Sequence, residues 1–361
     1  MSLPNHTADV SGFPTESHRA WKIVNPLEFP GWDDLLATHP DRSFFHTANW
    51  ARVLSESYQY RPQYFVSSNG TLEAIIPFME IRSLLTGKRG VSLPFTDYFT
   101  PIFAGDSVIQ DLMSSITRHG KASGWKYIEI RNSVSFPDSI PVFSNYYGHI
   151  LDLSGTEESI YAGFRDSTKR NIKKAVKGEV TVSGFTTEES IREFFRLNCL
   201  TRKEHGLPPQ PFIFFKKLYE HVISRGLGFT ALASYKGVNI AGVLCLHYGG
   251  KVIYKYGASD REYQNLRANN LAMWEAIRLS IRQGCKSFCF GRTEPDNQGL
   301  MQFKSGWGTK EQTIRYYRYN LETDTFVRGK PYGKAFYNKI FKAMPISFSR
   351  VAGEILYRHV G

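Results

Sequence analysis

The chain has 361 residues, of which 42% are hydrophobic and 14% aromatic. Such a composition allows a large buried core and excludes wholesale disorder, and the length indicates about two domains. The formal net charge of +12 favours anionic partners such as nucleic acid, phosphorylated carriers or anionic lipid, although a merely soluble basic surface has the same sign.

The cysteine and hydropathy patterns indicate the cellular compartment and whether the chain binds a metal or crosses a membrane. The four cysteines form no CxxC pair and no histidine pair completes a zinc pattern, so we expect a reducing compartment and no metal site. Residues 1–20 are polar, which predicts a disordered tail rather than a signal peptide. Since no run of about 18 apolar residues occurs, we expect a cytoplasmic protein without a membrane span, with peripheral contact at the inner face of the membrane as a further expectation.

The first half of the chain alternates strands and helices. The Asn69-Gly70 pair predicts a hairpin, because Asn-Gly favours the turn that joins two twisted strands. In chain order we expect a strand at 21–24, a helix at 48–58, a hairpin at 61–82, a helix at 106–124 and a strand at 125–132.

The second half repeats this order after a basic helical segment at 156–178. Leu271, Trp274, Ile277 and Ile281 share one helical face, and Gly284 ends that helix. In chain order we expect helices near 188–204 and 211–225, strands at 229–235, 240–248 and 251–259, a helix at 269–284 and a strand at 286–291.

The two halves also share a detail at the joint between helix and strand. In both, Gly-x-Lys precedes the strand and an arginine, Arg131 or Arg292, lies at its far end. The pattern indicates a duplicated α/β unit with mixed twisted sheets flanked by helices, and chance similarity of two joints is the alternative. We place the units at 21–155 and 156–320, followed by an amphipathic segment at 321–361.

Several common catalytic motifs are absent from the sequence. There is no GxxxxGK[ST], no GxSxG, no HExxH and no GxGxxG after a strand. Chemistry without a covalent nucleophile, a metal or a tightly bound organic cofactor remains. Group transfer from an activated donor fits, because such a donor brings its own leaving group and the protein supplies position and electrostatics.

The segment 254–308 carries a resemblance to a known family. It contains Y-x-Y-G-A-S, A-N-N-L-x-x-W-E-A-I, F-x-F-G and G-L-x-x-F-K-S-G-W-G in that order. This order resembles the FemABX family of peptidoglycan-bridge aminoacyltransferases, within the GNAT-type N-acyltransferase superfamily. The basic segment 167–178 and the stretches 43–54 and 94–101 also look like family elements. The resemblance implies two tandem GNAT-like units and aminoacyl transfer onto an amine of a cell-envelope or exopolysaccharide precursor.

The sequence leaves two acyl donors open. GNAT proteins that use acetyl-CoA bind its pyrophosphate through a loop (Q/R)xxGx(G/A) at a helix N-terminus, and here that place holds the glycine-free residues 265–270. This favours aminoacyl-tRNA, the donor that the resemblance implies, over acyl-CoA. The expected partners are thus aminoacyl-tRNA and a phosphorylated or lipid-linked precursor. A non-catalytic module that binds RNA or anionic membrane is the remaining alternative.

Two residues are our catalytic candidates. Lys304 follows Phe303 and precedes Ser305-Gly306, so packing can hold the segment while the ammonium projects to stabilise an oxyanion or bind phosphate. The family motif F-K-S-G points the same way, and a solvated surface lysine is the alternative. Arg292 leaves a strand end, where α/β sheets place ligands. It either grips a phosphate or pairs with an acidic turn formed by Glu294 and Asp296, either of which could be a base if buried.

The remaining candidates are substrate- and phosphate-binding residues. Tyr254 and Tyr256 lie two apart on a strand, so we expect them on one face as the walls of a groove; aromatic core packing is the alternative. Ser259 and Asn269 are polar partners for substrate. Glu129 and Arg131 either hold the acceptor or form an internal ion pair. A basic stripe on one helix, which is either an RNA or lipid-phosphate contact or a solvated face, comprises Lys169, Arg170, Lys173, Lys174 and Lys177.

Overall fold

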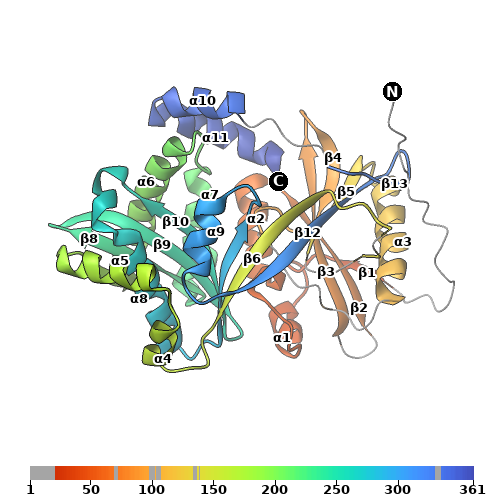
Figure 1. Cartoon of the computed structure of the whole chain (residues 1–361). Helices are drawn as coiled ribbons and strands as arrows, with labels where there is room; N and C mark the ends of the chain where they lie inside the picture. Colours follow the sequence, from red (N-terminus) through yellow and green to blue (C-terminus); the bar gives the residue numbers. More distant parts are fainter. Residues whose placement is uncertain are drawn as a thin grey trace. The chain divides into compact units, whose positions relative to one another are not determined.

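The computed structural model describes residues 21–68, 72–96, 102, 107–132, 136–137, 139–329 and 335–361. The predicted tail and the Asn69-Gly70 turn lie outside these residues. The chain forms two compact units, shown with their element labels in Figure 1. Unit 1 comprises Met1–Tyr146, Thr313–Pro331 and Arg358–Gly361, and unit 2 comprises Tyr147–Gln312 and Tyr332–Tyr357.

Unit 1 contains a sheet with the strand order β1-β2-β3-β4-β5-β12. Neighbouring strands are antiparallel except β4 and β5, which run parallel because helix α3 crosses between them. Its strands are β1 (Lys22–Val24), β2 (Arg61–Ser68), β3 (Leu72–Ser83), β4 (Gly87–Val91), β5 (Tyr127–Asn132) and β12 (Lys310–Asn320), to which β13 (Thr325–Phe326) adds. Its helices are α1 (Trp32–Ala37), η2 (Phe44–His46), α2 (Ala48–Tyr58) and α3 (Ser107–Ala122).

Unit 2 contains a sheet of matching order, β7-β8-β9-β10-β11-β6. Here the parallel pair is β10 and β11, and helix α8 makes the crossover. Its strands are β6 (Ser144–Asp152), β7 (Thr181–Phe185), β8 (Gly228–Tyr235), β9 (Val238–Tyr248), β10 (Lys251–Ser259) and β11 (Ser287–Thr293). The helices are α4 (Glu157–Ala162), α5 (Asp166–Lys177), α6 (Glu188–Glu204), α7 (Phe212–His221), η3 (Ile223–Arg225), η4 (Arg261–Leu266), α8 (Ala268–Arg282), α9 (Gln298–Ser305), α10 (Ala335–Ala343) and α11 (Ile346–Val360).

The two sheets confirm the predicted pair of α/β units, and their last strands are exchanged. Strand β6 follows β5 in the chain but pairs with β11 in unit 2. Strand β12 follows α9 in the chain but pairs with β5 in unit 1. The last strand of each sheet therefore comes from the part of the chain that directly follows the other sheet: β6 follows β5 and completes the sheet of unit 2, and β12 follows β11 and α9 and completes the sheet of unit 1.

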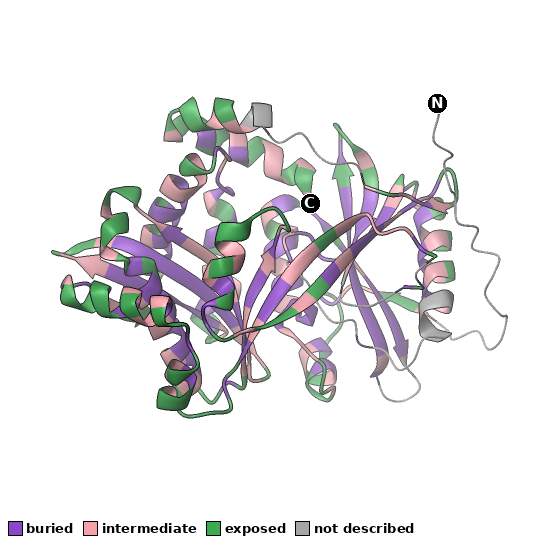
Figure 2. Cartoon of the chain, viewed as in Figure 1, coloured by how far each residue is buried: buried purple, intermediate pink, exposed green. Residues whose placement is uncertain are grey.

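The sheet of unit 2 is covered by helices on both faces. Its α8 face holds a continuous core in which Phe288, Phe290 and Trp307 are buried. The opposite face packs against α6 and α7 through Phe194, Phe214 and other buried apolar side chains. Figure 2 shows the resulting run of buried residues through β8, β9 and β10. Both faces of the sheet at β10 are thus packed against a core.

Two predicted elements near the candidate site are wrong in detail. The helical segment 156–178 is two helices, because Phe164 turns into the core and packs edge-on against Trp274 and Trp307 between α4 and α5. Residues Gln298–Ser305, for which we predicted no helix, form helix α9. Its start is set by Asn297, whose side-chain oxygen accepts a hydrogen bond from the Leu300 N–H.

Candidate active site

The parallel strands β10 and β11 separate after three paired positions. Their register runs from Lys251 opposite Ser287 to Ile253 opposite Cys289, yet β10 continues to Ser259 and β11 to Thr293. A β-bulge in each strand follows the last pair. A bulge bends its strand and increases the local twist, so the two carboxyl ends diverge. Openings at the carboxyl ends of parallel strands are where open α/β sheets bind ligands.

The bulge in β10 overturns one prediction. Tyr254 lies opposite Cys245 of β9, but Tyr256 lies opposite Leu244, so Lys255 is the extra residue. Since Cys245 and Leu244 are adjacent in β9 and point to opposite faces, Tyr254 and Tyr256 also point to opposite faces. Our expectation that they form one wall of a groove is wrong.

The contacts of the two tyrosines agree with this assignment. Tyr254 packs with Phe290 on the α8 face, with ring centroids 6.3 Å apart. Tyr256 packs with Phe214 and Phe215 of α7, at 6.1 and 5.8 Å. Tyr256 therefore supports the core beneath α7, whereas Tyr254 remains on the side of the sheet that also carries α8 and α9.

The open edge of β10 is completed by a side chain from α6. The Ser259 N–H donates to Thr201 Oγ1 at 2.8 Å, and the Thr201 hydroxyl donates to the Ser259 carbonyl at 3.0 Å. The Asn269 side-chain amide, in the first turn of α8, donates to Ser259 Oγ at 3.0 Å. The structure thus brings Ser259 and Asn269 together at the end of β10, and their role toward substrate stays a prediction.

The bulge in β11 lies at Phe290 and Gly291, which together oppose the single residue His149 of β6. Gly291 has a φ of 69°, a left-handed conformation that a glycine takes without strain. The ladder hydrogen bonds are interrupted at this point. The carbonyls of Gly291 and Arg292 accept hydrogen bonds from a side chain of α9.

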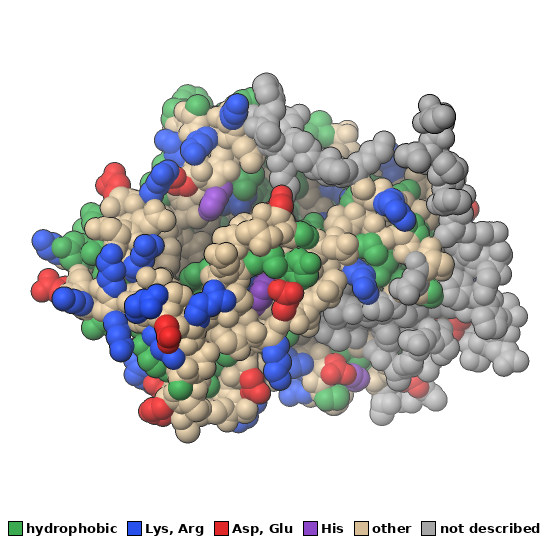
Figure 3. All heavy atoms as spheres, viewed as in Figure 1, with side chains coloured by type: hydrophobic (Ala, Val, Ile, Leu, Met, Phe, Trp, Pro, Cys, Tyr) green, Lys and Arg blue, Asp and Glu red, His purple; other side chains and the backbone are tan. Residues whose placement is uncertain are grey.

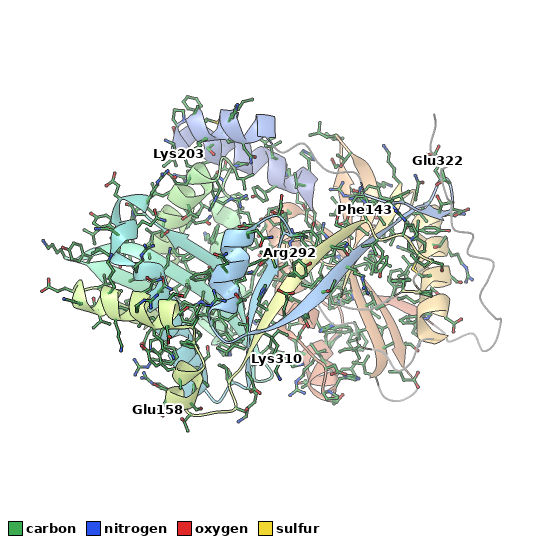
Figure 4. All side chains as sticks on the ribbon, in the orientation of Figure 1. Phe143, Glu158, Lys203, Arg292, Lys310 and Glu322 are labelled. Carbon is green, nitrogen blue, oxygen red and sulfur yellow. The ribbon has the colours of Figure 1, made fainter. Side chains whose placement is uncertain are left out.

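That side chain is Lys304. It is only 3% exposed, and its Nζ donates to the Gly291 carbonyl at 3.0 Å and to the Arg292 carbonyl at 2.9 Å. The solvated-lysine interpretation is wrong, whereas the role of the ammonium toward an oxyanion stays a prediction. The positive charge of Lys304 is therefore held beneath the end of β11. The half-buried Arg292 belongs to β11 itself and lies beside α9 (Figure 4).

His149 is a site residue that the sequence analysis did not identify. It is 1% exposed, and neither ring nitrogen has a hydrogen-bond partner among the described residues. Its Nε2 lies 3.5 Å from a carboxylate oxygen of the half-exposed Glu311. Burial lowers the pKa of His149, the charge of Lys304 lowers it further, and Glu311 offsets part of this. The imidazole is therefore neutral at neutral pH and faces a carboxylate.

Glu129 and Arg131 form the internal ion pair that was one of our two interpretations. Glu129 is 4% exposed and accepts hydrogen bonds from Arg131 at 2.7 Å and from Arg318 Nε of β12 at 3.2 Å. Burial raises the pKa of Glu129, but the charges and hydrogen bonds of Arg131 and Arg318 together hold it below its ordinary value. This triad lies within unit 1 and links β5 to β12.

The predicted basic stripe lies on α5, and all of its cations but Lys169 are exposed. Arg170, Lys173, Lys174 and Lys177 are exposed. Lys169 is half-buried, and its ammonium donates to the Ala162 carbonyl at the end of α4, at 2.8 Å. Lysine and arginine side chains gather on this face of unit 2 in Figure 3. The exposed cations form a surface suited to a polyanion.

Two further expectations concern the acidic turn and the start of α8. Glu294 and Asp296 lie in a turn in which the Asn297 N–H donates to the Glu294 carbonyl, and Asp296 is exposed. The plain acidic turn was one of our interpretations. Arg267, at the start of α8, adopts φ 59°. The chain therefore makes a left-handed turn there without glycine, which weakens the argument against a pyrophosphate at that helix end.

Comparisons with known proteins agree with this geometry. Residues 162–305 match the family model described as Acetyltransferase (GNAT) domain. Lipid II:glycine glycyltransferase of Staphylococcus haemolyticus is 34% identical over 79 residues, which are 20% of this chain and 19% of that protein. The match thus spans about a fifth of the curated relative.

Solved structures show the same fold over most of the chain. The crystal structure of FemX matches with a TM-score of 0.64 and 14% identity, covering 82% of this chain and 96% of that one. A tandem GNAT protein from the clavulanic acid biosynthesis pathway matches with a TM-score of 0.51 and 8% identity, covering 84% and 98%. The site at the diverging strands therefore belongs to a tandem GNAT fold. Residues 162–305 are thus similar to a GNAT acetyltransferase domain, and the chain is similar in fold to FemX.

Proposed function

We propose that the chain is an N-acyltransferase that moves an aminoacyl group from an activated donor onto an amine of a lipid-linked cell-envelope precursor. The observation that carries the proposal is the buried Lys304 ammonium fixed at the point where β10 and β11 diverge. The GNAT domain match over the same residues and the glycyltransferase relative support the class of reaction.

In such a transfer the amine nitrogen bonds to the donor carbonyl carbon, and the bond from that carbon to the leaving oxygen or sulfur breaks. The amine loses one proton and the leaving group gains one. The fixed charge of Lys304 stabilises the negative charge that develops on the carbonyl oxygen, without reorganisation at the moment of reaction. Arg292 binds a phosphate of the carrier or acceptor.

His149 is our candidate for the proton acceptor. A neutral imidazole with its hydrogen on Nδ1 can accept a proton at Nε2, which lies toward the Glu311 carboxylate, and that carboxylate favours proton uptake. Because His149 is buried, we propose that the proton reaches it through the half-exposed Glu311 rather than directly from the amine. The sequence alternatives Glu294 and Asp296 are less well placed, since their turn is open to solvent at Asp296.

Aminoacyl-tRNA is our proposed donor. The exposed cations of α5 give a polyanion a binding surface in the same unit as Lys304. An acyl-CoA donor is the second candidate, favoured by the left-handed turn of Arg267 at the start of α8. Incubation of the protein with glycyl-tRNA or acetyl-CoA and an amine acceptor separates the two. We expect an amide product with glycyl-tRNA only; amide from acetyl-CoA alone would contradict the proposed donor.

We further propose that the acceptor is lipid-linked and that the protein works at the cytoplasmic face of the membrane as a peripheral protein. In the part of the chain that the structure describes, no helix has the length and apolar character needed to cross a bilayer. Contact with the lipid-linked acceptor then requires a surface that binds the bilayer from one side.

A further inference from the structure

Helix α11 has its large apolar side chains on the outside. Phe348, Val351 and Ile355 are 66%, 55% and 57% exposed. Their spacing of three and four residues places them on one face of the helix. A surface helix of a globular protein normally turns such a face toward the core, with polar residues outward. The arrangement in α11 is the reverse.

The inner face of α11 is small and firmly attached within unit 2. Ser349 is 2% exposed, and a Cβ on Gly353 would lie 2.0 Å from the Pro209 carbonyl oxygen, so only glycine allows this close approach. Tyr357 receives a hydrogen bond from Arg202 of α6 at 2.7 Å and donates one to the Pro208 carbonyl at 3.2 Å. The helix is therefore fixed with its apolar face directed away from unit 2.

Charge on the two C-terminal helices is strongly asymmetric. Residues 335–361 contain four lysines or arginines and one acidic residue, Glu354. Lys339 and Lys342 of α10 and Arg350 and Arg358 of α11 are all exposed. Hydrophobic and basic side chains lie side by side on the surface over α10 and α11 in Figure 3. An exposed apolar face together with an excess of cations is typical of a helix that lies in the interface of an anionic bilayer.

We propose that the face of α11 formed by Phe348, Val351 and Ile355 is the surface that inserts into an anionic lipid bilayer. A protein partner fits less well, because three side chains on one helix cover far less than the roughly 800 Å² per partner of a stable interface. A bilayer needs no such area, since a single helix binds by burying one apolar face in the headgroup region. The inference rests on the proposed function, which brings the protein to a lipid-linked acceptor.

The link to the site is α6. Its Arg202 contacts α11, and the preceding residue Thr201 completes the edge of β10 at Ser259. A bilayer contact on α11 is thus one helix away from the diverging strands in the same unit. Binding there positions the site close to the membrane surface rather than remote from it.

The test uses the full chain and vesicles of phosphatidylglycerol and phosphatidylcholine in equal parts, with pure phosphatidylcholine as the comparison. We expect sedimentation with the anionic vesicles only. The triple variant Phe348→Ser, Val351→Ser and Ile355→Ser should bind these vesicles at least about tenfold more weakly than wild type. Val238→Ser, which alters an apolar side chain 49% exposed on β9, is the matched control and should bind like wild type.

A second readout locates the contact. Phe348→Trp should show fluorescence quenching by brominated phosphatidylglycerol beyond that of the wild-type tryptophans. Wild-type binding by the triple variant would overturn the inference. Loss of binding in Lys173→Gln with Lys174→Gln but not in the triple variant would move the contact to α5 and also overturn it.

Two further measurements separate this inference from others. If the triple substitution converts a dimer to a monomer in sedimentation velocity while wild type ignores vesicles, the face binds a second copy and the inference is wrong. Transfer to a water-soluble amine acceptor tests the proposed function independently. Transfer without vesicle binding contradicts only the membrane inference, whereas vesicle binding without transfer contradicts only the proposed function.

Discussion

Lys304 Nζ donates a hydrogen bond to the backbone carbonyl of Arg292 at 2.9 Å, and to that of Gly291 at 3.0 Å. One side chain of α9 thereby binds two consecutive carbonyls at the bulge in β11. The same contact fixes a positive charge at the end of the strand. Structure and proposed chemistry thus depend on the same ammonium group.

Substitution of Lys304 should therefore affect stability as well as activity. Lys304→Met keeps most of the apolar stem but leaves both carbonyls without their donor, and we expect a loss of about 3 kcal/mol in the free energy of unfolding. Urea denaturation measures this. Lys310→Met removes an exposed lysine near the start of β12 and should change stability by less than about 0.5 kcal/mol. Equal stability of the two variants would contradict the buried contact.

His149 should make stability depend on pH. Its pKa in the folded protein is lowered from 6.5, so the unfolded chain binds more protons as the pH falls below about 6.5. The contribution of His149 to the free energy of unfolding is therefore complete above the unfolded pKa. It is lost as the pH falls from there to the lower pKa of the folded protein. In His149→Gln this pH-dependent contribution to stability is absent, because glutamine does not titrate.

We therefore expect the unfolding free energy of wild type to fall more steeply between about pH 7 and pH 5 than that of His149→Gln. Burial also lowers the pKa values of His119, His205 and His247, but these contribute equally to both proteins. Parallel curves for the two proteins would show that His149 titrates normally. In transfer assays, the pH–rate profile should lose its acid limb in His149→Gln if this imidazole accepts the proton.

Glu129 should be a structural residue of unit 1. Glu129→Gln leaves Arg131 and Arg318 without their buried carboxylate, and breaking such a pair typically costs about 3–5 kcal/mol. Since the pKa of Glu129 is lowered from 4.5, its contribution is complete above that pH and is lost as the pH falls through the folded value. Thermal unfolding of both proteins at neutral pH measures the cost. A variant as stable as wild type, with only a raised KM for the acceptor, would favour the acceptor role instead.

The exposed lysines of α5 should affect tRNA binding, whereas the half-buried Lys169 should affect stability. Lys173→Gln with Lys174→Gln removes two exposed charges, so we expect weaker tRNA binding with a shallower dependence on salt and unchanged stability. Lys169→Gln removes the donor to the Ala162 carbonyl and should lower stability by about 1 kcal/mol. Fluorescence anisotropy with labelled tRNA across a salt series distinguishes them. Identical salt slopes for wild type and the double variant would rule out this surface.

Long periodic segments of the fold could be predicted from the sequence. The helix at 48–58 and the helix near 188–204 have the predicted bounds, because their apolar faces and capping residues are local features. The exchange of β6 and β12 between the two sheets could not be predicted, since it depends on which strands pair far apart in the chain. Local pattern carries no information on that choice.

The candidate site was predicted less completely than the fold. Lys304 and Arg292 could be selected from the sequence, and the Lys304 ammonium contacts the backbone carbonyl of Arg292. Tyr254 and Tyr256 were expected on one face, because a simple alternation cannot reveal the extra residue at Lys255. His149 escaped notice within the strand-like residues 144–152; a histidine among apolar strand residues was the available signal, but its burial and its proximity to Glu311 arise only in the fold.

The most direct test of the central claim is a single-turnover transfer assay with labelled glycyl-tRNA and a lipid-linked amine acceptor. We predict that wild type and Lys310→Met form the labelled amide at the same rate, and that folded Lys304→Met is slower by about 100-fold or more. Transfer by Lys304→Met at the wild-type rate would contradict the account.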